Sequence, residues 1–262
     1  MTEQSIRFEV DAGLARVTFN RPEAGNAMDR AFMHRIREVA ERCAVDDAVR
    51  AVLLTGSGRM FSVGGDLAWF GQDLATVGSL IKEAAGQLHE AVSTFARMRK
   101  PMVVAVNGPA AGAGFSMALL GDYTIAAQSA SFTMAYTAAG LSPDGGASYL
   151  LPRLVGDARA RELMLTNRKL SADEALAWGM INAVVPDDQL QQAAEQMALR
   201  LAAGPTQAFA TVKELLASSP LVSLETQLAF EADGIAANAS RADGQEGIAA
   251  FLGKRRPAFC GR

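Results

Sequence analysis

The stretch KPMVVAVNGPAAGAGFSMALL, residues 100–120, determines how the rest of this chain is interpreted. Its first part, Met102 to Val106, is a short run rich in β-branched residues and bounded by Pro101, which is typical of a buried strand. The turn that follows contains mostly small residues, so its backbone can approach another segment or a ligand closely. If a helix begins near Ala113, its first amides have no partner inside the helix and can donate to an oxygen that becomes negative during a reaction.

A Gly/Ala-rich turn after a strand often serves only to let a helix pack closely on a sheet, and taken alone this turn fits that interpretation. It is not a dinucleotide-binding G-x-G-x-x-G motif, because Met117 stands where the third glycine would be, and no G-x-x-x-x-G-K-[ST] phosphate loop is present. A nucleotide-binding oxidoreductase is therefore not favoured. Two other features favour a functional turn: a second glycine loop, FSVGGDL (residues 61–67), and a downstream carboxylate, Asp144.

The composition is that of a globular protein, with 262 residues of which 50% are apolar and 20% charged. A net charge of −3 argues against a nucleic-acid-binding surface. Cys43 and Cys260 lie in no metal-binding spacing and fit a reducing compartment. No secretory leader and no run of about 20 apolar residues is visible, so we expect a cytoplasmic protein without a membrane partner.

Strands are expected mainly in the first half of the chain and helices in the last third. The expected strands cover residues 6–10, 14–20, 51–54, 102–106, 122–126 and 131–134. The expected helices run from 29 to about 43, over 79–98, from about 113, over 145–154, from 171, over 187–203 and 206–218, and through most of 221–251. Asp29 is a predicted N-cap, and Ser171 with Glu174 a predicted capping box. The pattern predicts an α/β core with a helical appendage that packs on something, such as another subunit.

The loops FSVGGDL, VAVNGPAAGAG and PDGG (residues 143–146) occur in an order and spacing that resemble the crotonase, or enoyl-CoA hydratase/isomerase, family. The resemblance extends over ARVTFNRPEAGNAMD, RAVLLTGSGRMF, KLSADEALAWGMINAVVP and FLGKRRPAF, which is nearly the whole chain. It implies an α/β fold with a spiral core of stacked ββα turns and a C-terminal helical trimerisation region. We therefore expect residues 1–200 to form a core that binds acyl-CoA and residues 201–262 to make subunit contacts. The implied assembly is a homotrimer or a dimer of trimers.

The resemblance also implies a role for the two glycine loops. Members of the family bind an acyl-CoA thioester and hold its carbonyl oxygen between two backbone amides, which by position are those of Gly65 and Ala113. Coenzyme A is thus part of the substrate, and neither a separate cofactor nor a metal is implied. The neighbouring residues expected to bind the substrate are Gly64, Asp66, Leu67 and Gly112, with the Asp66 carboxylate also holding its own loop.

The nucleotide end of coenzyme A is expected near the backbone of Ala24, Asn26 and Met28. Lys254, in the basic run KRR near the C-terminus, is expected to offer charge to the phosphates, in relatives often from a neighbouring subunit. A solvated tail explains that basic run equally well. Relatives often carry a lysine after the first glycine loop, whereas this sequence has Ala68 there, which puts one phosphate contact in doubt.

Hydratases of the family use two glutamates to add water across a conjugated double bond, and the matching residues here are Ser116 and Tyr136. Neither side chain can act as a carboxylate acid or base, so hydration by that route is not expected. Asp144 is the remaining carboxylate of this block. Taken alone it would be interpreted as a helix N-cap, but the retained glycine loops favour a catalytic base. One carboxylate is what a double-bond shift needs, because the same group takes a proton from C2 and returns it at C4.

The stretch SASFTMAYTAAGLSPDGGASYLLPRLVG resembles most closely the subgroup that contains the ring-epoxide isomerase of phenylacetate degradation. We therefore expect an enoyl-CoA isomerase with Asp144 as base. The placing of His89, Tyr136 and Asp144 also resembles 4-chlorobenzoyl-CoA dehalogenase, in which the matching aspartate attacks the aromatic ring. Dehalogenation or thioester hydrolysis with Asp144 as nucleophile stays open, as does a CoA-binding protein without catalysis. His89 fits a boundary residue of an amphipathic helix at least as well as a base.

Overall fold

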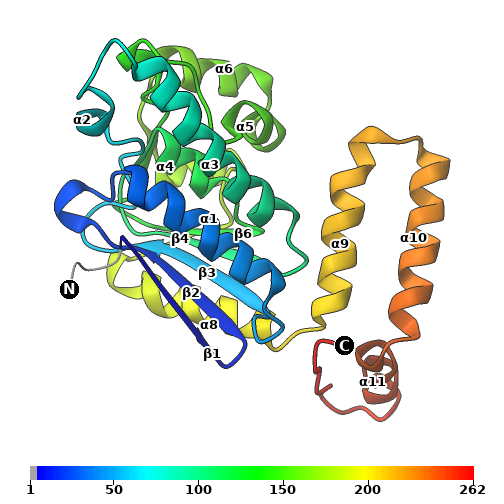
Figure 1. Cartoon of the computed structure of the whole chain (residues 1–262). Helices are drawn as coiled ribbons and strands as arrows, with labels where there is room; N and C mark the ends of the chain where they lie inside the picture. The colour runs from blue at the N-terminus through cyan, green and yellow to red at the C-terminus, as the bar shows by residue number, and fades with distance from the viewer. Residues whose placement is uncertain (1–4) are drawn as a thin grey trace.

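Strands and helices alternate in the first half of the chain, and only helices follow β9 (Figure 1). The structure is a computed structural model that describes residues 5–262. The strands are β1 (Ile6–Asp11), β2 (Leu14–Phe19), β3 (Ala51–Gly56), β4 (Met102–Val106), β5 (Ala110–Ala111), β6 (Tyr123–Ala127), β7 (Ser131–Thr133), β8 (Leu170–Ser171) and β9 (Ala183–Val185). The α-helices are α1 (Arg30–Val45), α2 (Leu67–Phe70), α3 (Val77–Arg97), α4 (Ala113–Ala118), α5 (Ala147–Val155), α6 (Asp157–Thr166), α7 (Ala172–Ala177), α8 (Leu190–Ala202), α9 (Thr206–Ser218), α10 (Leu224–Ala239) and α11 (Ala242–Leu252). Short 3-10 turns are η1 (Pro22–Ala24), η2 (Thr137–Ala139), η3 (Asp187–Gln189) and η4 (Ser219–Leu221).

Two sheets organise the core. The larger is six-stranded in the order β1-β2-β3-β4-β6-β9, with β1 antiparallel to β2 and the other pairs parallel. The smaller sheet has the order β5-β7-β8. All five residues of β4 are buried, as expected of a parallel strand covered on both faces. Because parallel neighbours require crossover connections, the chain passes repeatedly from a strand through a helix to the next strand.

Helices α1 and α8 cover opposite faces of the larger sheet. On β2 the ring of Phe19 contacts the ring of Phe32 in α1, with centroids 5.0 Å apart. The guanidinium of Arg16, also on β2, pairs with Glu195 in α8. Side chains of a strand alternate between its faces, so residues three apart point in opposite directions. Helix α3 packs along α1 and adds to that layer (Figure 1).

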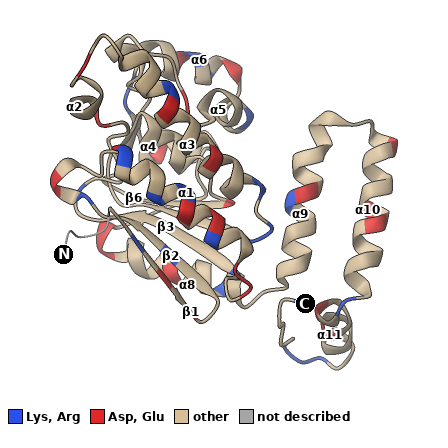
Figure 2. Ribbon diagram, in the orientation of Figure 1, with Lys and Arg blue, Asp and Glu red and all other residues tan. Residues whose placement is uncertain are grey.

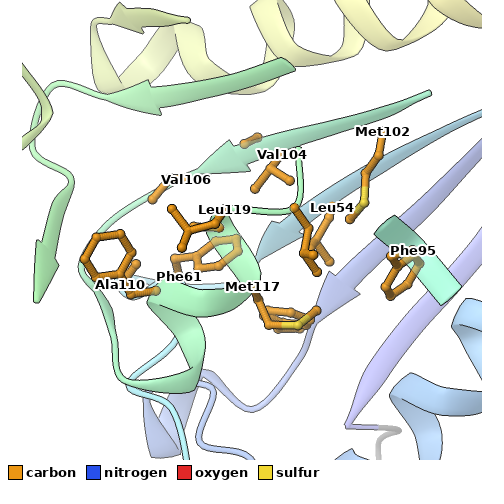
Figure 3. Packing of buried hydrophobic residues seen from close by; sticks show 14 of the residues in the cluster. Leu54, Phe61, Phe95, Met102, Val104, Val106, Ala110, Met117 and Leu119 are labelled. Atoms are coloured by element: carbon orange, nitrogen blue, oxygen red, sulfur yellow. The ribbon is translucent and has the colours of Figure 1, made fainter. Parts of the chain in front are cut away.

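The short helix α4 is anchored by side chains that enter the core beside β3 and β4. Met117 of α4 and Leu119, just beyond it, lie near Leu54 and Val104 in Figure 3. All four are buried, and burying an apolar side chain of this size contributes about 1.5–3 kcal/mol. A helix of only six residues has little stability of its own. Its position at the end of β4 therefore depends on this packing.

The predicted α/β class and C-terminal helical region are confirmed. Asp29 caps α1 by accepting a hydrogen bond from the amide of Phe32 at 2.9 Å, and the capping box at Ser171 is present. The helix expected over 221–251 is divided into α10 and α11. Ser240 is the C-cap of the first helix, and Arg241 is the N-cap of the second. The sequence analysis did not identify α6, whose buried residues are few and follow no strong helical stripe.

Helices α9, α10 and α11 stand beside the core (Figure 1). Figure 2 shows few charged residues on α9 and α10. Exposed apolar side chains on these helices include Val212, Leu216, Leu224, Leu228, Ile235 and Phe251. The division at residue 200 stays a prediction, and residues 1–4 of the predicted first unit lie outside the described range. Among the helices of residues 5–262, none is both long and apolar enough to cross a bilayer.

Candidate active site

The first donor loop, which we define as residues 62–66, is held by backbone hydrogen bonds to two other segments. The amide of Met28 donates to the carbonyl of Gly64 at 2.8 Å. On the other side, the amide of Ala111 donates to the carbonyl of Ser62, also at 2.8 Å. The loop is therefore fixed between the segment before α1 and the segment before α4, although these are far apart in the sequence.

Gly64 brings the first donor loop into contact with the second donor turn, defined as residues 110–114. A Cβ at Gly64 would lie 2.8 Å from both the carbonyl oxygen of Ala111 and the amide nitrogen of Ala113. Its φ of +89° also disfavours any other residue. The missing side chain is thus what allows the two backbones to lie next to each other.

The amides of Gly65 and Ala113 are free to donate to a ligand. Within residues 5–262 neither N–H has a hydrogen-bond acceptor in the protein. Backbone donors in folded proteins are nearly always paired, so two unpaired amides in adjacent loops are unusual. Both residues line one cavity of about 420 Å³. This arrangement can bind an oxygen atom that gains negative charge.

The cavity has an apolar wall and a small polar end. Its larger aliphatic and phenyl side chains are Met33, Val63, Leu67, Phe70, Ile81 and Leu141. Its polar side chains are His89, Tyr136, Ser142 and Asp144. A mostly apolar cavity with a few convergent polar groups is the usual form of a site for a small organic group.

Asp144 lies at the polar end and is held by Tyr136. The phenol of Tyr136 donates to Oδ1 of Asp144 at 2.6 Å. The hydroxyl of Ser116 lies 3.0 Å from the Tyr136 hydroxyl and 3.0 Å from the Asp144 carbonyl oxygen, to which it can donate. The N-cap of α5 is Gly146, and no side chain of the described residues caps this helix. The interpretation of Asp144 as a plain N-cap is therefore wrong.

His89 of α3 lies beside the same carboxylate. Its Nε2 is 4.0 Å from Oδ2 of Asp144 and accepts a hydrogen bond from the amide of Gly145 at 3.1 Å. A ring nitrogen that accepts from an N–H carries no proton, so the proton of the neutral ring is on Nδ1. His89 is half-exposed. It is a boundary residue that also reaches the site.

The positions that match the two hydratase glutamates are occupied by a connected pair of hydroxyls. Burial, and next the negative charge of Asp144, raises the pKa of Tyr136 above its ordinary value. The phenol therefore keeps its proton throughout the neutral range. Ser116 is fully buried, and a Cβ at Gly145 would be 2.8 Å from the Ser116 Cβ. A glutamate at residue 116 would have to displace the loop that carries Asp144.

Two of the residues predicted to contact coenzyme A are inside the protein. Asn26 and Met28 are both fully buried. The side-chain amide of Asn26 donates to the carbonyls of Ser57, Met60 and Phe61 at 2.8–3.1 Å. Both residues also support the first donor loop from behind, since the Asn26 carbonyl accepts from Ser62 and the Met28 amide donates to Gly64. The contact of their backbones with coenzyme A stays a prediction.

Of the other residues predicted to bind the substrate, some line the cavity and others lie outside it. Leu67 and Gly112 line the cavity, whereas Ala24 lies in η1 and is partly exposed outside it. Asp66 caps α2 by accepting from the amide of Trp69 at 3.1 Å, as expected of a residue that holds its own loop. Lys254 follows α11, and Figure 1 shows α11 on the opposite side of the molecule from α2. Within one chain it is not brought to the cavity.

No cluster of three or more His, Cys, Asp or Glu side chains is arranged to hold a metal ion in the part of the chain that the structure describes. The polar groups that line the cavity are the two amides, one carboxylate, one phenol, one imidazole and the hydroxyl of Ser142. This set suits proton transfer next to a carbonyl group whose oxygen takes up the charge.

Ser62 is a residue that the sequence analysis missed. Its buried hydroxyl donates to the carbonyl of Asn26 at 2.8 Å and accepts from the amide of Gly64 at 3.1 Å. Serine in a glycine loop gives no distinct sequence signal, because its partners come from elsewhere in the chain. The Ser62 hydroxyl accepts from the amide of Gly64. Of these two neighbouring amides, only that of Gly65 therefore lacks an acceptor among the described residues.

Ser62→Ala is expected to lower the free energy of unfolding by about 1–3 kcal/mol, because it leaves two buried backbone groups without partners. Urea unfolding followed by circular dichroism measures this change. Ser57→Ala is a suitable control, since no partner is present for that buried hydroxyl among the described residues. Equal stability of the Ser62 variant and the wild type would contradict the assignment.

Comparison with known proteins agrees with this geometry. Residues 9–262 match the family described as enoyl-CoA hydratase/isomerase. The chain is 40% identical to 1,2-epoxyphenylacetyl-CoA isomerase of Escherichia coli K12, over 98% of both chains. It is 34% identical to 4-chlorobenzoyl coenzyme A dehalogenase-2 of an Arthrobacter species, over 97% of this chain and 92% of that one. The crystal structure of an enoyl-CoA hydratase from Polaromonas sp. JS666 superposes with a TM-score of 0.92 at 34% identity, over 97% of this chain and 99% of that one.

These matches extend over nearly the full length, and the fold is shared at a level of identity that reflects common descent. They confirm the resemblance noted in the sequence. The chain therefore belongs to the enoyl-CoA hydratase/isomerase family.

Proposed function

We propose that this protein is an acyl-CoA isomerase that moves a double bond from the 3,4 to the 2,3 position of an enoyl thioester. The observation that supports this proposal is the set of groups that line the cavity. Asp144 is the single carboxylate among its lining residues, and the free amides of Gly65 and Ala113 line the same space. Coenzyme A enters as part of the substrate, and no separate cofactor takes part. The protein works in the cytoplasm.

Asp144 takes a proton from C2, and the electron pair of that bond moves into the thioester as its oxygen becomes negative. The amides of Gly65 and Ala113 donate to this oxygen and so stabilise the dienolate. The protonated carboxyl group then returns the proton to C4, and the new double bond forms between C2 and C3. The reaction consumes no water and changes no oxidation state, so one carboxylate is sufficient.

The replaced glutamates argue against hydration. Ser116 and Tyr136 are engaged with each other and with Asp144, and neither offers a carboxylate to activate water. A ring-epoxide acyl-CoA, the substrate class in the name of the Escherichia coli relative, is a second candidate substrate because the wall of the cavity is apolar.

The test is an activity screen of the wild type with 3-enoyl-, 2-enoyl- and aryl-CoA thioesters. Isomerisation is expected as a rise in the ultraviolet absorbance of the conjugated 2-enoyl thioester. Hydration of 2-enoyl-CoA that is faster than isomerisation would contradict the proposal. Binding of every thioester with turnover of none would instead indicate a CoA-binding protein.

An aryl-CoA dehalogenase or thioester hydrolase is the alternative, favoured by the position of His89 beside Asp144. In the dehalogenase reaction the carboxylate of Asp144 attacks the ring carbon that bears the chlorine, chloride leaves, and an aryl ester of Asp144 forms. In thioester hydrolysis the carboxylate attacks the thioester carbonyl, the coenzyme A thiolate leaves, and an acyl anhydride forms. Mass spectrometry after incubation with 4-chlorobenzoyl-CoA distinguishes the two, because only a nucleophilic Asp144 gives a covalent adduct. Against this alternative, Nε2 of His89 already accepts from the Gly145 amide and so has no lone pair ready to activate water.

We also propose that α9, α10 and α11 contact other copies of the chain in a trimer or a dimer of trimers. Their exposed apolar side chains include Leu216, Ile235 and Phe251, which are 69%, 72% and 83% exposed in the single chain. Surfaces of this kind usually mark an interface. Light scattering at micromolar concentration should give three or six chains per particle, and a monomer would contradict the proposal.

A further inference from the structure

A chain of hydroxyl groups ends on one oxygen of the proposed base. Ser116 contacts Tyr136 at 3.0 Å, and Tyr136 donates to Oδ1 of Asp144 at 2.6 Å. Ser116 also lies 3.0 Å from the carbonyl oxygen of Asp144. Because Tyr136 gives its one hydroxyl proton to Asp144, Ser116 donates its own proton either to the tyrosine oxygen or to this carbonyl. The other carboxylate oxygen, Oδ2, accepts no hydrogen bond from residues 5–262 and lies 4.0 Å from Nε2 of His89.

We infer that Tyr136 is a positioning residue for the base: it holds Oδ1 of Asp144 in place and leaves Oδ2 as the oxygen that exchanges the proton with the substrate. This inference rests on the proposed function, because it assumes that Asp144 is a base. Ser116 supports the tyrosine from behind. The two positions that carry glutamates in hydratases thus serve here to orient one carboxylate.

This arrangement suits a reaction in which one carboxylate oxygen removes a proton from C2 and returns it to C4. The same oxygen has to reach two carbon atoms of the bound acyl chain while the amides of Gly65 and Ala113 hold the thioester oxygen. A carboxylate that rotated freely would offer either oxygen and would lose the alignment needed for both transfers. Fixing Oδ1 leaves Oδ2 with one direction of approach.

Tyr136 is suited to this role because it is a constant donor. Burial and the neighbouring carboxylate both raise the pKa of the phenol, so it does not ionise in the range in which Asp144 works. A hydrogen bond to a carboxylate stabilises the charged form.

The titratable groups that face Asp144 are Tyr136 from the segment before η2 and His89 from α3. Ser116 of α4 also faces it but does not titrate. In residues 5–262 no Lys or Arg forms an ion pair with Asp144. The titration is therefore repeated with Tyr136→Phe in a His89→Gln background. This separates the effect of the tyrosine from that of the histidine. Glutamine is chosen because its carbonyl oxygen can still accept from Gly145.

Tyr136→Phe is the test, measured as kcat/KM against pH with a 3-enoyl-CoA substrate. Because a hydrogen bond to the charged form of the carboxylate is lost, the acid limb of the profile should move to higher pH. We also expect kcat below the wild-type value at every pH, with KM nearly unchanged. Tyr149→Phe is the matched control, because Tyr149 is exposed and lies outside the cavity. A purely structural role would lower activity without moving the limb.

The titration of the Asp144 carboxyl group, followed by ¹³C NMR without substrate, separates this inference from the proposed function. Its signal is assigned as the one absent from Asp144→Asn. A titration midpoint that moves upward in Tyr136→Phe supports the contact between Tyr136 and Asp144, whether or not the wild type isomerises 3-enoyl-CoA. Absence of isomerisation by the wild type would overturn the proposed function alone. Isomerisation with neither the limb nor the midpoint moved would overturn the inference. If the phenylalanine variant does not fold, a downfield hydroxyl proton in the wild type that follows the Asp144 titration supports the contact, and its absence refutes it.

Discussion

Asp144→Asn is expected to lower kcat for 3-enoyl-CoA isomerisation by about 10²- to 10⁴-fold, the range that one general base contributes. Asparagine has nearly the same shape, and its carbonyl oxygen can still accept from the phenol of Tyr136. The orientation of the side chain and the cavity should therefore be kept, while the ability to accept a proton from C2 is lost. The rate of formation of the conjugated thioester measures the effect.

Binding should persist in this variant, because the thioester oxygen is held by the amides of Gly65 and Ala113 and not by Asp144. Isothermal titration calorimetry with a saturated acyl-CoA should give similar affinities for variant and wild type. Asp157→Asn is the matched control, since that carboxylate is exposed and pairs with Arg161 away from the cavity. Turnover of Asp144→Asn at the wild-type rate would end the assignment of Asp144 as the base.

Ala113→Pro should reduce kcat by about 10²- to 10³-fold, because it removes one of the two donors to the thioester oxygen. Ala113 is the first residue of α4, a position at which proline is well tolerated. Its N–H makes no hydrogen bond within the described part of the chain, so the fold does not need it. The proline ring also occupies space next to the amide position, which should weaken binding of the thioester.

Ala113→Gly is the control for this change, because it removes the side chain and keeps the amide. Circular dichroism and thermal melting of both variants should show that α4 and the core remain folded. The comparison is kcat and KM of the two variants on the same 3-enoyl-CoA. Equal turnover of the proline and glycine variants would show that the amide of Ala113 does not stabilise the transition state.

Much of the fold was predictable because its signals are local. The β-branched run of β4 and the N-cap at Asp29 each depend on residues within a few positions of one another. The separate helix α6 and the break at Ser240 were not predicted, since their buried faces are weak and their limits depend on packing. The glycine loops were also recognisable, because a backbone that must come close to another segment excludes side chains at particular positions.

The candidate site was predictable in its parts and not in its connections. Gly65, Ala113 and Asp144 lie on one cavity, as the family resemblance implied. For Asn26 and Met28 the resemblance implied backbone contacts with coenzyme A. It could not show that their side chains are buried against the first donor loop, because burial is set by segments that lie far away along the chain. Likewise Lys254, which follows α11, is not among the residues that line the cavity.

By itself the sequence determined the α/β class, the two glycine loops and the single carboxylate that remains once the hydratase glutamates are absent. Only the tertiary structure decided which oxygen of Asp144 is held, because Tyr136 and Ser116 reach it from separate segments. It also decided that His89, on α3, faces the same group. Short-range patterns report backbone conformation, whereas the direction of a side chain in a site depends on packing between elements that meet only when the chain is folded.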